Sequence, residues 1–334
     1  MEASLNPPMS ARTALRFAAD LRLPTTAERS ALTAWASKPG IATSLALGAA
    51  LFGCWILTYW ETWLSLTKRW NEDSNYSHGF LVPLVSLYLA AQAVVRRDAI
   101  AAGGGSLFVG AALILFGLSL EYVTVLFPSL VAECLSMLTV LAGGIVLLGG
   151  AGWWWRLQAP VLFLLFMVPW PAALYKRVAF PLQLFVSELA TTLIELLGIP
   201  VLREGNVIQL PKQTMHVAEA CSGLRQLTAF LAICTCAALL CKRPTWYRAT
   251  LLLSSIPIAV AINVLRVTAT GLALQYGYGS WTEGTMHTVE GLVMVGLGMG
   301  LLWLEVAVLD WMLVHEPKPA AEPANESLAA QAAG

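Results

Sequence analysis

The stretch LVAECLSMLTVLAGGIVLLGG, residues 130–150, is 21 residues long and carries one charged side chain, Glu133. A helix needs roughly 20 predominantly apolar residues to cross a bilayer, so this stretch predicts a transmembrane helix. Seven further stretches meet the same requirement, at approximately residues 41–60, 79–95, 105–126, 157–175, 221–241, 249–274 and 288–311. The sequence therefore predicts a chain that crosses a membrane about eight times.

The composition of the whole chain agrees with this prediction. Of the 334 residues, 57% are hydrophobic and 12% are charged, whereas about a quarter of the residues of a soluble domain are charged. The formal net charge is zero, which argues against nucleic acid as a partner because phosphate binding needs a clustered basic surface. We expect an all-α membrane protein, a polytopic helical bundle.

Residues 177–197 form a further apolar segment of a different kind. The segment mixes Leu, Phe, Val and Ile with six polar side chains, Gln183, Ser187, Glu188, Thr191, Thr192 and Glu195. This mixture is typical of an amphipathic helix that lies in the membrane interface. If the segment crossed, the basic loop at residues 242–248 would lie outside, against the preference of Lys and Arg for cytoplasmic loops. We therefore predict one interfacial helix beside the crossings.

The distribution of basic residues predicts the orientation. With the N-terminus inside and eight crossings, the inside segments hold twelve Lys and Arg residues and the outside segments hold six, as the positive-inside rule requires. Residues 1–40 then form a cytoplasmic N-terminal segment, residues 41–311 the transmembrane domain and residues 312–334 a disordered cytoplasmic tail. No cleaved signal peptide is expected in the first forty residues.

The octet AEACSGLR, residues 218–225, places Cys221 at the predicted start of an apolar helix with Arg225 at i+4. A helix N-terminus and a nearby cation both favour the reactive thiolate over the thiol. Glu219 and Ser222 flank the cysteine and make a simple packing role less suitable. The alternative is that Cys221 is a small packing residue, as most cysteines in membrane helices are.

Two later apolar stretches carry Arg266 and His287. Arg266 lies seventeen residues beyond Ala249, which at ~1.5 Å per residue puts it about 25 Å up a core roughly 30 Å thick. His287 immediately precedes the last stretch. On the predicted topology Cys221, Arg266 and His287 therefore lie at one level, near the outer face. A charged side chain inside a span is expensive and by default indicates a functional site.

These residue types fit nucleophilic catalysis. Arg266 would bind a peptide carboxylate or stabilise an oxyanion, with Asn263 at i−3 as a second donor. His287 would act as base and then as acid to the leaving amine, with Glu290 at i+3 orienting the ring. The alternatives are a structural arginine that snorkels to the headgroups or satisfies carbonyls, and a polar histidine at headgroup level.

Other histidines compete for the role of base. His216 lies five residues before Cys221, and His78 lies at the start of the second apolar stretch. The four histidines show no HExxH motif or comparable spacing of metal ligands. We expect no metal and no cofactor.

Several motifs together resemble the exosortases, the multi-span bacterial relatives of archaeosortase. The site motifs are AEACSGLR at residues 218–225, NVLR at residues 263–266, and His287 followed by Glu290 and Gly291. Three further segments resemble the family, NYSHGFLVPLVSLYL at 75–89, FLLFMVPWP at 163–171 and GIPVLREGNVIQLP at 198–211. The resemblance covers about residues 76–302.

The resemblance implies a membrane-embedded cysteine transpeptidase of the bacterial inner membrane, with its active site at the periplasmic, outer face. Its substrates would be exported proteins with a C-terminal sorting signal made of a PEP-type motif, a transmembrane stretch and a basic tail. By position, Cys221 matches the nucleophile, and Arg266 and His287 match the family arginine and histidine. A thioester would form and be resolved by an acceptor on a membrane lipid or surface polymer, or by water.

Two other functions fit the residues. The chain could be a transporter or export component for surface polysaccharide, in which Arg225 and Arg266 bind anionic substrate within the membrane. It could also be a non-catalytic assembly partner. Replacement of Cys221 discriminates between these readings, because a transporter should tolerate the loss of the thiol.

Overall fold

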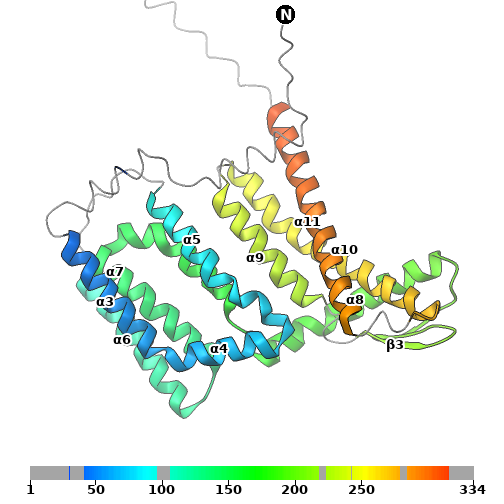
Figure 1. Ribbon diagram of the computed structural model, residues 1–334, viewed down its shortest axis with the longest axis horizontal. Coiled ribbons are helices and arrows are strands. Elements are labelled where there is room, and N and C mark those ends of the chain that lie inside the picture. The colour runs from blue at the N-terminus through cyan, green and yellow to red at the C-terminus, as the bar shows by residue number, and fades with distance from the viewer. Residues whose placement is uncertain are drawn as a thin grey trace, which may run out of the picture.

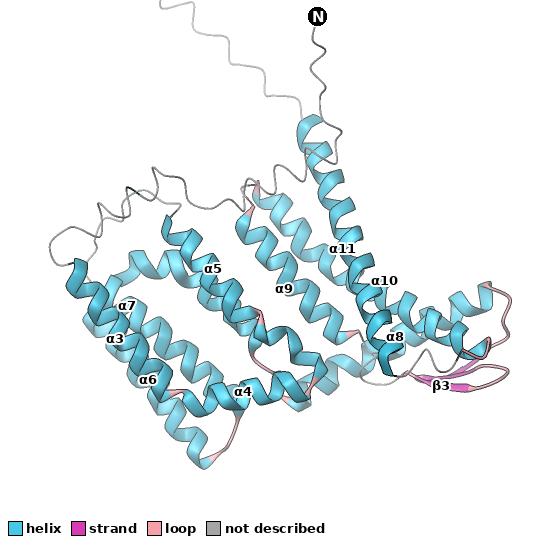
Figure 2. Ribbon diagram, in the orientation of Figure 1, coloured by secondary structure: helices cyan, strands magenta, loops and turns pink. Residues whose placement is uncertain are grey.

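The computed structural model describes residue 30 and residues 41–95, 106–217, 223–241, 243–278 and 284–315. These residues form helices and one small sheet (Figures 1 and 2), so the all-α prediction is confirmed. The helices are α3 (Ile41–Thr58), α4 (Trp60–Glu72), η1 (Ser74–Phe80), α5 (Val82–Val95), α6 (Leu107–Leu126), α7 (Leu130–Phe163), η2 (Leu164–Met167), α8 (Ala172–Leu196), α9 (Leu224–Leu240), α10 (Thr245–Gln275) and α11 (Gly284–His315). The strands are β1 (Leu202–Glu204), β2 (Val207–Gln209) and β3 (Thr214–His216).

Six helical segments in the described part of the chain are long and apolar enough to cross a membrane. They are Ser74–Val94, Leu107–Leu126, Leu130–Met167, Ala172–Leu196, Thr245–Gln275 and Gly291–Met312. Two shorter apolar helices accompany them, Ala46–Thr58 and Leu224–Leu240. Each predicted stretch thus contains helix, but the stretches at 130–150 and 157–175 share the 38-residue segment Leu130–Met167.

Helix α7 consists of two arms that meet at Gly150, whose φ of 69° and ψ of −165° are not helical. The first arm packs closely on α6, because a Cβ added to Gly110 would lie 2.6 Å from the backbone of Leu147. Small residues allow this approach of two membrane helices. The second arm packs on α5, where Ser86 Oγ donates to Pro160 O at 2.8 Å. The kink therefore separates the two spans that the sequence predicted here.

The predicted helix at 157–175 is wrong at its C-terminal end. The helical chain ends at Met167, residues 168–171 are extended, and α8 begins at Ala172. Pro169 and Pro171 explain the break, because proline lacks an N–H group and disfavours helical backbone in the residue before it. The break places Trp170 between two helices.

Helix α8 starts earlier than predicted and is itself long and apolar enough to cross a membrane. In Figure 1 it runs across the lower end of α9 and then alongside the second half of α10. Gln183, Ser187 and Thr191 are buried against the protein, whereas Glu188 and Thr192 are exposed. The position of α8 in the membrane interface remains a prediction.

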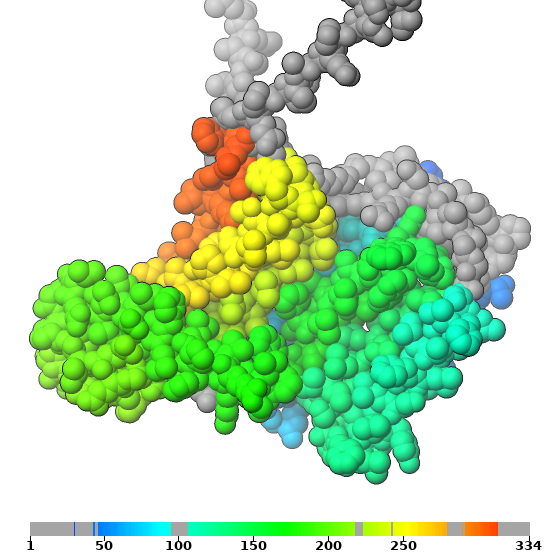
Figure 3. Space-filling model, turned by 180° about the vertical axis from the view of Figure 1, so that it is seen from behind, coloured from blue at the N-terminus to red at the C-terminus, as the bar shows by residue number. Residues whose placement is uncertain are grey.

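The sheet was not predicted. Its strands are antiparallel in the order β1-β2-β3, and Gly205, with a φ of 64°, makes the turn between the first two. The buried side chains of Ile208 and Met215 belong to a core that includes Val186, Ala190 and Ile194 of α8 and Val264 and Val267 of α10. In Figure 3 this light-green region forms a lobe that projects beside α10.

The last helix, α11, lies beside α10 (Figure 1). Ser254 Oγ donates to Glu305 Oε2 at 2.7 Å, and Arg243 pairs with Asp310 at 3.0 Å. The helix continues to His315, four residues into the segment predicted as a disordered tail. The rest of that tail, and the predicted cytoplasmic N-terminal segment apart from residue 30, lie outside the described residues.

Candidate functional site

The helix that carries Arg225 begins later than predicted. Helix α9 starts at Leu224, and Gly223 before it has a φ of 84°, in the left-handed region. A left-handed residue cannot continue a right-handed helix, so α9 begins three residues later than predicted, at Leu224. The segment 218–222 lies outside the described residues, and with it three of the predicted site residues, Glu219, Cys221 and Ser222.

The chain is held firmly just before this segment, at Val217. Val217 is 1% exposed, and its N–H group donates to Asn206 O at 2.9 Å. Its carbonyl accepts from two side-chain amides, Asn206 Nδ2 at 3.2 Å and Gln183 Nε2. The hairpin turn and α8 together therefore fix the residue that leads into the cysteine segment.

The chain is equally constrained just after the segment, at Gly223. A Cβ added to Gly223 would lie 2.8 Å from Asn263 Nδ2 and 2.9 Å from Asn263 Cγ. Asn263 is fully buried on α10, so its side chain packs directly on the glycine two residues beyond Cys221. The contact brings Asn263 of the NVLR motif to Gly223 of the AEACSGLR motif.

Arg266 lies on α10 one turn beyond Asn263 and is 3% exposed. A snorkelling arginine keeps its guanidinium in water or among headgroups, whereas this side chain is enclosed by protein. Burial of a charge is expensive unless protein groups compensate it. Three residues beyond Asn263, it lies on roughly the same face of α10.

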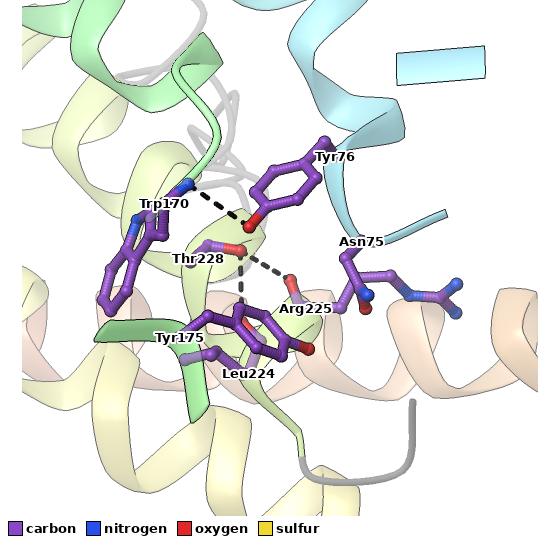
Figure 4. Close-up of a pocket in the computed structure, with 7 residues that line it drawn as sticks. All are labelled: Asn75, Tyr76, Trp170, Tyr175, Leu224, Arg225 and Thr228. Atoms are coloured by element: carbon purple, nitrogen blue, oxygen red, sulfur yellow. Dashed lines mark hydrogen bonds between the residues drawn. The ribbon is translucent and has the colours of Figure 1, made fainter. Parts of the chain in front are cut away.

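A small pocket opens beside the N-terminus of α9 (Figure 4). Figure 4 shows the rings of Tyr76, Trp170 and Tyr175 around Thr228, with the Arg225 side chain extending past Asn75. The lining residues are Asn75, Tyr76, Trp170, Tyr175, Leu224, Arg225 and Thr228. Residues from three segments singled out in the sequence, 75–89, 163–171 and 218–225, thus line one aromatic pocket at the start of α9.

Side chains of α4 and η1 hold the extended wall of this pocket. The backbone N–H group of Trp170 donates to Tyr76 Oη at 3.2 Å, and the indole Nε1 of Trp70 donates to Met167 O at 3.0 Å. His78 Nε2 lies 3.1 Å from the carbonyl of Phe166. Pro169 and Pro171 lack the N–H groups that helical hydrogen bonds would need here. Side chains from residues 70–78 hydrogen-bond to the backbone groups left without helical partners. His78, predicted as an alternative base, is thus hydrogen-bonded to η2, next to the extended residues.

The family model described as transmembrane exosortase matches residues 70–304 of the chain, well over half of its length. The chain belongs to the exosortase family. No curated protein and no solved structure matched the chain.

The match to the exosortase family model ends at residue 304, within α11. It includes His287 and His216, the two other histidines predicted as the catalytic base. Helix α11 begins at Gly284, so His287 lies in its first turn rather than before the helix, with Glu290 three residues further along. The side chains of both residues lie outside what the structure describes. His216 is exposed on β3, one residue before the fixed Val217.

Two residues of the exosortase site region were missed as site residues. Gln183 appeared in the sequence only as one of several polar side chains of α8, and Asn206 only within a resembling segment. The available signal for Gln183 was an uncharged polar side chain in an apolar helix, since such a group is buried only with a partner. Among the described residues, no group of three or more His, Cys, Asp or Glu side chains could hold a metal ion.

Proposed function

We propose that this exosortase-family chain is a cysteine protease and transpeptidase embedded in the bacterial inner membrane. It would cleave the C-terminal PEP-type sorting signal of exported proteins and transfer them to a surface acceptor. The proposal places the active site at the periplasmic face and both termini in the cytoplasm. The supporting observation is the pair of contacts that brackets Cys221, Val217 with Gln183 and Asn206 on one side and Gly223 with Asn263 on the other.

The proposed chemistry has two halves. The Cys221 thiolate attacks the scissile carbonyl, Arg266 stabilises the oxyanion, and His287 protonates the departing amine. The resulting thioester is then attacked by an amine or hydroxyl of a membrane lipid or surface polymer, or by water. The apolar segment of the substrate packs against the bundle and holds the scissile bond at the outer face, and such positioning supplies much of the rate enhancement.

The role of Cys221 is tested in cells that express a tagged protein with the sorting signal. Cys221→Ala and Cys221→Ser should leave the substrate unprocessed at normal enzyme level. Cys236→Ala is the matched control, because this half-buried thiol lies on α9 within the bundle and should not matter. Normal processing by Cys221→Ala would refute the transpeptidase proposal and favour the transport alternative.

The identity of the base is tested by comparing His287→Ala with His216→Ala in the same cells. The proposal expects the first variant to stop processing and the second to retain it. If only His216→Ala lost processing, the base would be His216 on β3 and not His287.

A further inference from the structure

Strand β3 forms one edge of the small sheet (Figure 2). The Val217 N–H group, just beyond β3, donates to Asn206 O at 2.9 Å across the pair with β2. In an antiparallel pair, residues that bond to the partner strand alternate with residues that do not, so Met215 also bonds toward β2. Thr214 and His216 therefore direct their backbone N–H and C=O groups to the opposite, outer side of β3.

The outer edge of β3 is open. Within the part of the chain that the structure describes, no group hydrogen-bonds to the backbone of Thr214 or His216 on this side. The side chains of both residues are exposed as well. Such an edge presents backbone groups at the spacing of a further strand, and extended peptides bind proteins by adding a strand to an edge of this kind.

The two faces of β3 differ in chemistry. Side chains alternate between the faces along a strand, so Thr214 and His216 share the exposed face, and Lys212 is exposed in the turn just before them. The opposite face carries Met215, which is 7% exposed and belongs to the core shared with α8 and α10. An added strand would thus meet an ammonium group and an imidazole on one face and apolar side chains on the other.

We propose that an extended acidic segment of the substrate adds a fourth strand to this edge, antiparallel to β3, with its carboxylate opposite Thr214 and between Lys212 and His216. The identity of this segment rests on the proposed function, which supplies a PEP-type motif beside a membrane segment. A residue opposite Thr214 directs its N–H and C=O groups to β3. The neighbouring prolines then point their nitrogens away from β3, where an edge strand tolerates them, and their rings lie on the apolar face of Met215.

A second copy of the chain fits this edge less well than a substrate does. A stable interface buries about 800 Å² on each partner, which an edge of three residues does not provide. A substrate held in the same membrane by its own apolar segment has a high effective concentration at the site. A few backbone hydrogen bonds and one ion pair are then enough to align it.

A proline on the open edge tests the backbone pairing. Thr214→Pro removes one outward N–H group and leaves the bonds to β2 in place, because proline is tolerated on an edge strand. The loss of one donor should lower the processing of a tagged substrate by roughly 3- to 10-fold at normal enzyme level. Thr214→Val keeps the N–H group, and Arg203→Pro places the same change on β1, at the other edge of the sheet. Both controls should process substrate as the parent chain does.

Cross-linking in an inactive chain tests the added strand without any cleavage. The background carries Cys221→Ala, and Cys54→Ala because Cys54 is exposed. Thr214→Cys is then combined with substrates that carry one cysteine at successive positions of the motif, and a short bifunctional thiol reagent is added. Because side chains alternate along a strand, cross-links should form at every second position. With His216→Cys in place of Thr214→Cys, the strongest cross-link should move two positions toward the N-terminus of the substrate.

Cross-links at consecutive positions, cross-links that join two copies of the chain, or no cross-link at all would overturn the inference. Processing by Thr214→Pro at the rate of the parent chain would do the same. If Thr214→Pro does not accumulate, the cross-links alone decide. Normal processing by Cys221→Ala would refute the proposed chemistry, whereas the cross-link pattern would still test where the substrate binds.

Discussion

Replacement of Gly223 by alanine tests the packing of the cysteine segment most directly. The φ of Gly223 is 84°, and an L-residue in the left-handed region costs about 1–2 kcal/mol. The added Cβ would also lie between 2.8 and 3.0 Å from three atoms of the Asn263 side chain. Asn263 is fully buried and cannot swing away, so overpacking adds about 1–3 kcal/mol.

The expected destabilisation of Gly223→Ala is therefore about 2–5 kcal/mol, measured as a lower midpoint of thermal unfolding in detergent. Processing of a tagged substrate should fall with it if Cys221, two residues before Gly223, has the proposed role. Gly198→Ala is the matched control. Gly198 has a similar φ of 83° but nothing within 4 Å of an added Cβ, so only the backbone cost of about 1–2 kcal/mol applies.

A double-mutant cycle with Asn263→Ala separates the two costs. Alanine removes the Asn263 Nδ2 and Cγ atoms, at 2.8 and 2.9 Å from the added Cβ, but keeps the Cβ at 3.0 Å and the backbone strain of residue 223. The double variant should therefore be more stable than the sum of the single changes requires by up to about 1–3 kcal/mol. Strictly additive effects, or a Gly223→Ala variant as stable and active as the parent chain, would refute the packing of Asn263 on Gly223.

Three further changes have definite expected outcomes. Arg266→Lys should lower processing at least about 100-fold at normal protein level, because lysine lacks the planar fork that an oxyanion or carboxylate requires; retained processing would make Arg266 a structural residue. Gly110→Ala should lower the unfolding midpoint through about 1–3 kcal/mol of overpacking, since its Cβ would lie 2.6 Å from the α7 backbone, whereas Gly144→Ala meets nothing within 4 Å and should be neutral. Arg243→Ala should destabilise the chain by up to about 3–5 kcal/mol, because it leaves the Asp310 carboxylate, 8% exposed, without its cation at 3.0 Å; adding Asp310→Asn should restore most of the loss in the same unfolding assay.

The helices could be predicted because hydropathy over about 20 residues is a local property of the sequence. Where the predicted helix boundaries were wrong, one or two residues set the end of the helix although the surrounding stretch is apolar. Pro169 and Pro171 end the helix inside an otherwise apolar stretch, and the left-handed Gly223 delays the start of α9 to Leu224. A hydropathy average over about 20 residues is insensitive to a single glycine or proline, so it does not locate these helix ends.

The sheet could not be predicted in the same way, because strands of three residues are too short to show an alternating pattern. It is stabilised by packing of Ile208 and Met215 on α8 and α10, contacts that are distant in sequence. The same distinction between local patterns and contacts distant in sequence applies to the residues of the candidate site. Asn263 and Arg266 were predicted from their motif, whereas the bond from Gln183 to the Val217 carbonyl joins a side chain to a distant backbone group and leaves no local pattern.

The pocket of Figure 4 has a consequence for the order in which the protein is made. Its walls come from Asn75 and Tyr76, from Trp170 and Tyr175, and from the first turn of α9 that ends at Thr228. All three parts must therefore be synthesised and inserted into the bilayer before the nascent chain can form the complete pocket. Translation products that stop short of Leu224 lack the wall that Leu224, Arg225 and Thr228 supply, so an abortive polypeptide cannot form the cleft.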